Sequence, residues 1–214
     1  MRDLYIADRV AWANGRVARA IGGSADAYRP SGNFHPLSTG NRFLRLPAKF
    51  AALDGTLSRN HTYGEAAYGG YFDLSYTQPG DYLVQGERTW FIAAQEALGA
   101  ATCILTNHIV GLARPELSAS LGGTHYANGS TEPSTEYASQ WPASILATGR
   151  DSAVSLGLPT DILGTISTIL LPASMTLTIR PTDIVTDDLA RVHIVSGCEK
   201  SALGWRLIAR LVTP

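Results

Sequence analysis

The chain has 214 residues, of which 45% are hydrophobic and only 16% charged, so it is long enough to bury a sizeable core. Its net charge of −1, from 17 basic and 18 acidic residues, argues against a dedicated nucleic-acid binder, which needs a basic excess. Two cysteines are too few for a disulfide framework, and no apolar run reaches the roughly 18 residues of a membrane span.

The N-terminal segment, residues 1–25, predicts a helix. Apolar residues recur at spacings of three and four before Gly22 and Gly23 end the pattern, and they are Ile6, Val10, Ala13, Val17 and Ile21. This face is narrow, so we expect it to pack against something wide, either the chain's own barrel or a neighbouring subunit. The first residues, MRDLYIADR, contain acids and no apolar segment, which predicts no signal peptide and a cytoplasmic setting or a particle assembled there.

Residues 26–115 predict a first β module with an extended arm. Prolines at positions 30, 36 and 47 interrupt residues 26–54, so we expect an irregular arm that lies over a surface or a partner. Short strand-like runs follow, separated by turns that contain Gly or Pro, at residues 71–76, 82–85, 89–95 and 101–106.

Residues 116–143 are rich in Ser, Thr, Gly and Asn and predict a linker or long surface loop, so we divide the chain near residue 140. Residues 144–214 predict a second β module, with strand-like runs at 144–148, 161–171, 175–180, 184–186, 191–195 and 205–212. The predicted fold is therefore mainly β, with two small β-barrel or sandwich-like modules, an N-terminal helix and long extended loops.

An internal repeat links the two modules. PGDYLVQGERTWFIA at residues 79–93 aligns without a gap to PTDIVTDDLARVHIV at 181–195, which places Asp81 opposite Asp183, 102 residues apart. Both segments predict a β-hairpin with a polar tip, and an aspartate at a strand start forms an Asx turn with its own backbone. We interpret Asp81 and Asp183 as structural turn residues, because a catalytic acid is rarely duplicated in both halves of a chain.

The motifs of enzymes and metal sites do not occur in this sequence. His35, His61, His108, His125 and His193 lack the spacings that place two metal ligands on one strand or helix face, and there is no Cys-x-x-Cys pair. No nucleophile elbow or phosphate-binding loop with its lysine is present. Asp187 and Asp188 fall at a predicted hairpin tip, where two solvated charges are ordinary. We therefore predict no enzymatic activity, no catalytic residue, no cofactor and no metal.

The hairpins resemble the β-barrel modules of tailed-bacteriophage neck and tail proteins, such as head-completion or stopper proteins. Residues 80–83 with 90–92 carry this resemblance, as do residues 183–185 with 192–194, although Thr182 stands where a glycine is expected. The helix, Tyr28 to Pro30, and the run from Gly80 to Thr106 are also similar to phage structural proteins.

The resemblance implies a virion protein assembled in the host cytoplasm, a head–tail connector, neck or tail component that forms a ring around the DNA channel. Its partners would be further copies of the chain and neighbouring portal, neck or tail proteins, with non-specific passage of DNA and no membrane. The candidate interface residues are Arg29, Arg42, Arg45, Trp90 and Trp205.

The alternative is a ligand- or carbohydrate-binding β module of a tail tip or receptor-binding apparatus. In that case Tyr126, Tyr137 and Trp141 would be exposed platforms on which sugar rings stack. An enzyme that acts on cell-wall polymers is a more distant third hypothesis.

Overall fold

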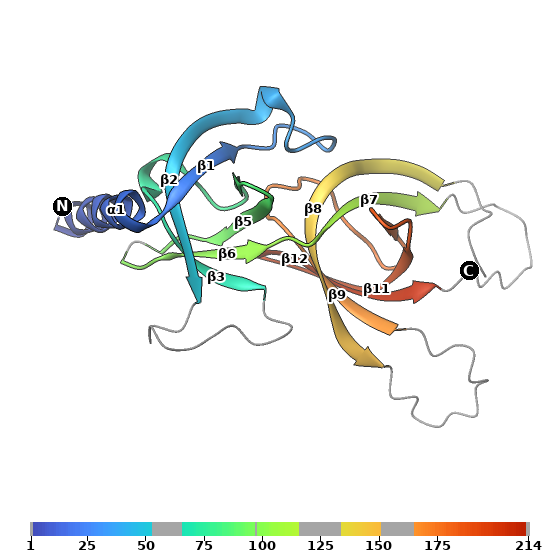
Figure 1. Cartoon of the computed structure of the whole chain (residues 1–214). Coiled ribbons are helices and arrows are strands. Elements are labelled where there is room, and N and C mark those ends of the chain that lie inside the picture. The colour runs from blue at the N-terminus through green and yellow to red at the C-terminus, as the bar shows by residue number, and fades with distance from the viewer. Residues whose placement is uncertain (1, 53–65, 97, 116–133, 151–164, 213–214) are drawn as a thin grey trace, which may run out of the picture.

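The computed structural model describes residues 2–52, 66–96, 98–115, 134–150 and 165–212. One helix, α1 (Arg2–Ile21), precedes two six-stranded antiparallel sheets that lie side by side in an elongated molecule (Figure 1). The helix lies at the end formed by the first sheet, and the second sheet forms the other end. The predicted mainly β fold, with an N-terminal helix and two β modules, is confirmed.

The first sheet closes into a barrel in the strand order β1-β2-β3-β6-β5-β4, because β4 pairs back onto β1. Its strands are β1 (Gly23–Tyr28), β2 (Arg42–Ala52), β3 (Ala67–Tyr71), β4 (Tyr82–Gln85), β5 (Arg88–Ala94) and β6 (Ala101–Leu105). Two short 3₁₀ helices, η1 (Thr39–Asn41) and η2 (Leu74–Tyr76), lie in its connections. Residues 71–76 were predicted to be a strand; instead the strand ends at Tyr71, and the Asp73 side chain accepts the Ser75 N–H to start η2.

The second barrel repeats this topology with every strand number raised by six, β7-β8-β9-β12-β11-β10, and β10 closes onto β7. Its strands are β7 (His108–Pro115), β8 (Ser134–Arg150), β9 (Thr165–Leu171), β10 (Ile184–Asp187), β11 (Val192–Ser201) and β12 (Gly204–Val212). The chain is thus a tandem repeat of one barrel topology. The change of barrel comes between β6 and β7 rather than near residue 140, and the described part of the predicted linker, residues 134–143, belongs to β8.

The two repeated hairpins differ in length by one residue. Tyr82 pairs with Phe91 in the first hairpin, whereas Ile184 pairs with Ile194 in the second, so the return strands are offset by 103 residues instead of 102. The first hairpin turns through two residues, with Gly86 at φ +61°, and the second through three, with Ala190 at φ +58°. The gap-free alignment is therefore wrong beyond the hairpin tip, and Trp90 corresponds to His193.

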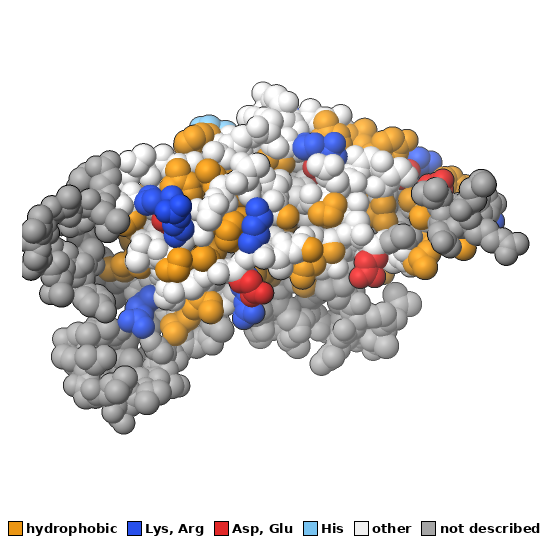
Figure 2. All heavy atoms as spheres, turned by 180° about the vertical axis from the view of Figure 1, so that it is seen from behind, with side chains coloured by type: hydrophobic (Ala, Val, Ile, Leu, Met, Phe, Trp, Pro, Cys, Tyr) orange, Lys and Arg blue, Asp and Glu red, His pale blue; other side chains and the backbone are white. Residues whose placement is uncertain are grey.

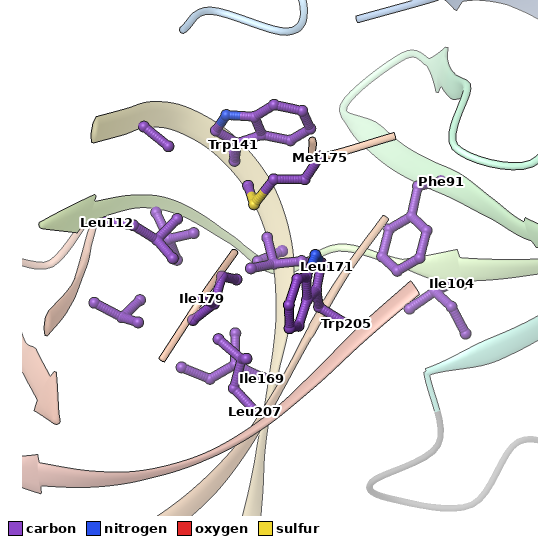
Figure 3. Packing of buried hydrophobic residues seen from close by; sticks show 14 of the residues in the cluster. Phe91, Ile104, Leu112, Trp141, Ile169, Leu171, Met175, Ile179, Trp205 and Leu207 are labelled. Atoms are coloured by element: carbon purple, nitrogen blue, oxygen red, sulfur yellow. The ribbon is translucent and has the colours of Figure 1, made fainter. Parts of the chain in front are cut away.

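A shared core joins the two barrels. In β4 and β5, side chains alternate between the interior of the first barrel and the second barrel, so both faces of these strands are buried. Tyr82 and Phe91 lie in the second barrel's hydrophobic cluster, where the Tyr82 ring is 6.2 Å from that of Trp141 and its hydroxyl donates to the Pro142 carbonyl at 2.8 Å. Figure 3 shows Phe91 and Ile104 beside Trp205 and Leu171 of this cluster. The barrels therefore share one apolar core across their contact.

The predicted arm, residues 26–54, is largely β structure in its described part. It contains the end of β1 and all of β2, and Pro47 is accommodated because β2 pairs with β1 alone until β3 joins at Lys49. Only the connection at residues 29–41 is irregular, and it lies on β8 of its own chain. There the Asn33 carbonyl accepts the Trp141 indole N–H at 2.6 Å, and the His35 N–H donates to Ser139 at 3.1 Å.

Residues 175–180 were also predicted to be a strand, but they form an irregular segment. Met175 and Ile179 from this segment are fully buried in the second barrel (Figure 3). Their apolar character therefore reflects core packing rather than strand pairing.

Candidate functional site

A buried aspartate stands before the first strand of each repeated hairpin, and its carboxylate is fully committed to the fold. Asp81, only 1% exposed, accepts the Gln78 N–H at 2.9 Å. Arg29, which follows β1, donates to both carboxylate oxygens, from Nε at 2.9 Å and from Nη2 at 2.8 Å. A bidentate guanidinium and a turn N–H together form a clamp between β1 and the turn before β4.

The second barrel repeats this clamp. Asp183 is also 1% exposed; it accepts the Arg180 N–H at 2.8 Å and both donors of Arg114, at 2.8 and 2.9 Å. The Tyr137 hydroxyl adds a further hydrogen bond at 2.7 Å. Burial alone would raise the pKa of the Asp183 carboxyl, but the hydrogen bonds from Arg114, Tyr137 and the Arg180 N–H outweigh it and hold that pKa below its usual value.

The surroundings of the clamps also correspond. The Arg29 guanidinium lies 4.6 Å from the Phe43 ring centroid, and that of Arg114 lies 5.0 Å from the Tyr137 ring centroid. By strand register, Arg29 in the first barrel corresponds to Arg114 in the second. Each of these arginines precedes a proline in the sequence. This repeated Arg-Pro pair is the signal that could have revealed Arg114, which sequence reasoning missed.

Backbone geometry shows that the turns themselves were duplicated. The residue before each aspartate has a positive φ, +95° at Gly80 and +78° at Thr182. Glycine adopts this region at little cost, whereas a β-branched threonine is strained there. Asp81 and Asp183 each accept the N–H three residues before them, which differs from the expected Asx turn, and both carboxylates are engaged by an arginine.

The candidate interface arginines pair within the chain. Arg29 holds Asp81, while Arg42 and Arg45 approach the Asp26 carboxylate at 2.7 and 3.2 Å. The three arginines that the sequence suggested as contacts to a partner protein therefore form ion pairs within their own chain.

The two candidate interface tryptophans are core residues. Trp90 is 2% exposed and stacks on Phe50 at 3.8 Å between ring centroids, and Trp205 is 6% exposed. An exposed interface at these indoles is excluded, because both rings fill barrel interiors.

The residues proposed as sugar-stacking platforms are also used by the fold, where they are described. Trp141 is fully buried between the barrels, and the Tyr137 hydroxyl is bound to Asp183. Tyr126 lies outside the described residues.

Helix α1 presents its larger apolar residues to solvent. It packs on β2, β3 and η2 through small residues, Ala11, Gly15 and Ala18, and a side chain at position 15 would lie within 3.3 Å of the Asp73 Cβ. The α1 stripe is the remaining apolar row, and it comprises Ile6, Val10, Ala13, Val17 and Ile21. Three of its residues are 46%, 41% and 64% exposed, namely Ile6, Val17 and Ile21. Of the two partners expected for this face, the chain's own barrel is the wrong one, because small residues on the other face allow the closer approach to the sheet. Packing on a neighbouring subunit stays a prediction.

Comparisons of the chain with protein families, with curated proteins and with solved structures found no match. Within the described residues, no helix has the length and apolar character needed to cross a membrane. The α1 stripe is thus the surface from which a function can be argued.

Proposed function

We propose that the chain is a virion structural protein, a head–tail connector, neck or tail component whose copies assemble into a ring around the DNA channel. The observation that carries this proposal is the α1 stripe, which stays exposed although the other side of the helix is packed on the barrel. An exposed row of large aliphatic side chains is a common mark of a protein–protein contact.

Burial of the stripe would contribute part of the driving force for assembly. Covering an exposed valine or isoleucine side chain gives about 1.5–3 kcal/mol, so the three most exposed residues contribute several kcal/mol per contact. Translational and rotational costs of association consume part of this, and the repetition of contacts around a closed ring offsets them.

The shape of the molecule favours a head-to-tail contact. α1 lies at one end and the second barrel at the other (Figure 1). Apolar side chains reach the surface along the molecule, including the end that carries α1 (Figure 2). On the second barrel, Leu189, Leu203 and Ile208 are 63%, 55% and 42% exposed. Exposed apolar side chains on α1 and on the second barrel would supply the two different surfaces of a heterologous interface, which closes into rings or extends into stacks.

The shared core supports the same function. Tyr82 and Phe91 pack into the second barrel, and the connection after β1 is bonded to β8. This continuous packing holds the two barrels in a fixed arrangement, as a ring subunit with one contact surface on each barrel would require.

Mass photometry and negative-stain microscopy of the purified chain test the proposal. We expect discrete rings of one stoichiometry, and we expect Val17→Asp combined with Ile21→Asp to return them to monomers. The matched control is Trp12→Asp, which also puts a carboxylate at an exposed apolar position of α1 (59% exposed) but outside the stripe.

A wild-type chain that stays monomeric over the accessible concentrations would contradict the ring. Loss of rings in Trp12→Asp as complete as in the stripe variant would show that the stripe is not the contact. Retention of a folded monomer on a polysaccharide matrix would instead favour the ligand-binding alternative.

A further inference from the structure

The tip of the second hairpin gathers ionisable side chains that are far apart in sequence. His108, at the start of β7, lies with its Nδ1 2.7 Å from an oxygen of Asp188 in the β10–β11 loop. Ligand atoms of His108, Asp187 and Asp188 all lie within 4.8 Å of one another. The sequence predicts two solvated aspartates at this tip, which holds for Asp188 at 42% side-chain exposure but is wrong for Asp187, whose side chain is fully buried.

The Asp187 carboxylate has one oxygen bound to the turn and one directed at other charged or polar groups. Oδ1 accepts the N–H groups of Leu189 at 3.0 Å and Arg191 at 2.9 Å, which shape the three-residue loop. Oδ2 accepts from Arg191 Nε at 2.7 Å and faces the His193 Nε2 at 3.6 Å. The loop would therefore keep its shape if Oδ2 changed partner.

His193 points into this cluster without a hydrogen bond of its own. The residue is 2% exposed, and neither ring nitrogen has a hydrogen-bond partner among the described residues. A buried polar group left unsatisfied costs about 1–3 kcal/mol, and the indole N–H groups of Trp90 and Trp205 are in the same state. His193 differs from them because its Nε2 faces a carboxylate oxygen, Asp187 Oδ2, at 3.6 Å. A neutral imidazole beside a carboxylate oxygen is a usual pair of ligands for a divalent transition metal.

The first barrel shows that the fold does not require these groups. By strand register, the positions of His108, Asp187 and His193 correspond to Gly23, Gln85 and Trp90.

There the Gln85 amide donates to the Ala48 carbonyl at 3.1 Å, and the Trp90 ring stacks on Phe50. The same barrel position is thus closed without an ionisable side chain. Asp187 holds the longer loop of the second hairpin, whereas His108 and His193 have no ionisable counterpart at the corresponding positions of the first barrel.

We propose that His108, Asp187, Asp188 and His193 form a binding site for a divalent transition-metal ion of the zinc type. Two imidazoles and two carboxylates are ligands that Zn²⁺ accepts in a tetrahedral site. Ligand atoms of such a site lie about 3.3 Å apart, so those of His108, Asp187 and Asp188, which lie within 4.8 Å of one another, must move closer together. His193 lies outside this group of three, with its Nε2 3.6 Å from Asp187 Oδ2, and would have to approach the ion from there.

The Arg191 guanidinium lies where the proposed metal ion would bind. Its Nε bonds Asp187 Oδ2, and its Nη2 lies 3.1 Å from His108 Nε2, so one guanidinium bridges two of the proposed ligands. The metal therefore replaces this guanidinium and has to compete with it. When bound, it ties the hairpin tip to His108, which directly follows the connection between the barrels.

Isothermal titration of the full chain with ZnCl₂, after removal of metals by a chelator, tests the site. We expect one equivalent to bind, at least about tenfold more weakly in Asp188→Asn and in His108→Gln. The matched control is His35→Gln, which removes an exposed histidine outside the cluster and should leave this affinity unchanged. Removal of the competing cation in Arg191→Gln should raise the affinity at least about tenfold. Circular dichroism establishes that each variant is folded.

Equal zinc binding in the wild type and in the Asp188→Asn variant would overturn the proposal. The same follows if His35→Gln loses as much affinity as His108→Gln, or if Arg191→Gln binds no tighter than the wild type. Binding of CaCl₂ in preference to ZnCl₂ would also refute it, because calcium selects oxygen ligands. The titration is independent of ring formation, since monomers suffice for it.

Discussion

Removing the guanidinium from each aspartate clamp should destabilise the chain by two different amounts. In Arg29→Gln, the buried Asp81 keeps one described hydrogen bond, from the Gln78 N–H. In Arg114→Gln, the buried Asp183 keeps two, from the Arg180 N–H and the Tyr137 hydroxyl. The carboxylate that retains more donors should tolerate the loss better.

The magnitude follows from burial and screening. Loss of one partner from a buried ion pair costs about 3–5 kcal/mol, but these arginine side chains are 43% and 39% exposed, so we reduce the expected cost to about 2–3 kcal/mol. In Arg114→Gln the Tyr137 hydroxyl still donates a hydrogen bond to the charged Asp183 carboxylate. Arg29→Gln has no such bond left and should therefore be the more destabilising variant, by about 1 kcal/mol.

Urea unfolding followed by tryptophan fluorescence and circular dichroism measures both free energies of unfolding. Tyr137→Phe in the Arg114→Gln background removes the extra hydroxyl and should bring the second clamp close to the first. An Arg29→Gln variant no less stable than Arg114→Gln would refute this reasoning. So would costs below about 0.5 kcal/mol for both variants, the level of an exposed ion pair.

Further predictions concern the backbone, acid stability and thiol reactivity. Thr182→Gly should stabilise the chain by about 1 kcal/mol in thermal unfolding, because it relieves a β-branched residue at positive φ. The lowered pKa of Asp183 gives stability that is present above the unfolded-state value of about 3.9 and is lost as the pH falls through the folded-state value. Asp183→Asn should therefore weaken the dependence of the melting temperature on pH between about pH 5 and pH 2. Burial raises the pKa of the Cys103 thiol, so a thiol reagent should label Cys103 only after unfolding. Peptide mapping distinguishes it from the half-buried Cys198, and rapid labelling of Cys103 in the native chain would contradict its burial.

The hairpins could be predicted from sequence because their signal is local. A proline, an aspartate at the strand start and a polar tip recur in both copies, and β4, β5, β6 and β12 lie within one residue of their predicted bounds. The strand order that closes each barrel could not be predicted in this way. Closure depends on the pairing of β1 with β4 and of β7 with β10, whose partner residues lie more than fifty positions apart in sequence.

The surface of α1 was misjudged for a related reason. Hydrophobic periodicity selects isoleucine and valine as the buried face, but the distance between helix and sheet decides which residues fit. Ala11 and Ala18 are buried because α1 lies close to the barrel, and close approach excludes the larger side chains. The extra residue in the second hairpin loop was also missed, because it does not change the pattern of apolar residues on which the alignment was based.

The two barrels serve as controls for each other, and this separates scaffold from function. The clamp is present in both, with its aspartate, bidentate arginine, aromatic ring and positive-φ turn residue, so its role belongs to barrel closure. His193 and Asp187 replace a stacked tryptophan and an amide that close the first barrel without charge. The Trp90 indole N–H also lacks a partner among the described residues, so the two barrels differ in the carboxylate that His193 faces and not in the presence of an unsatisfied group. A His193→Trp variant in the second barrel should therefore remain folded while it loses zinc binding, and a variant that unfolds would show that the cavity around His193 is shaped for the smaller ring.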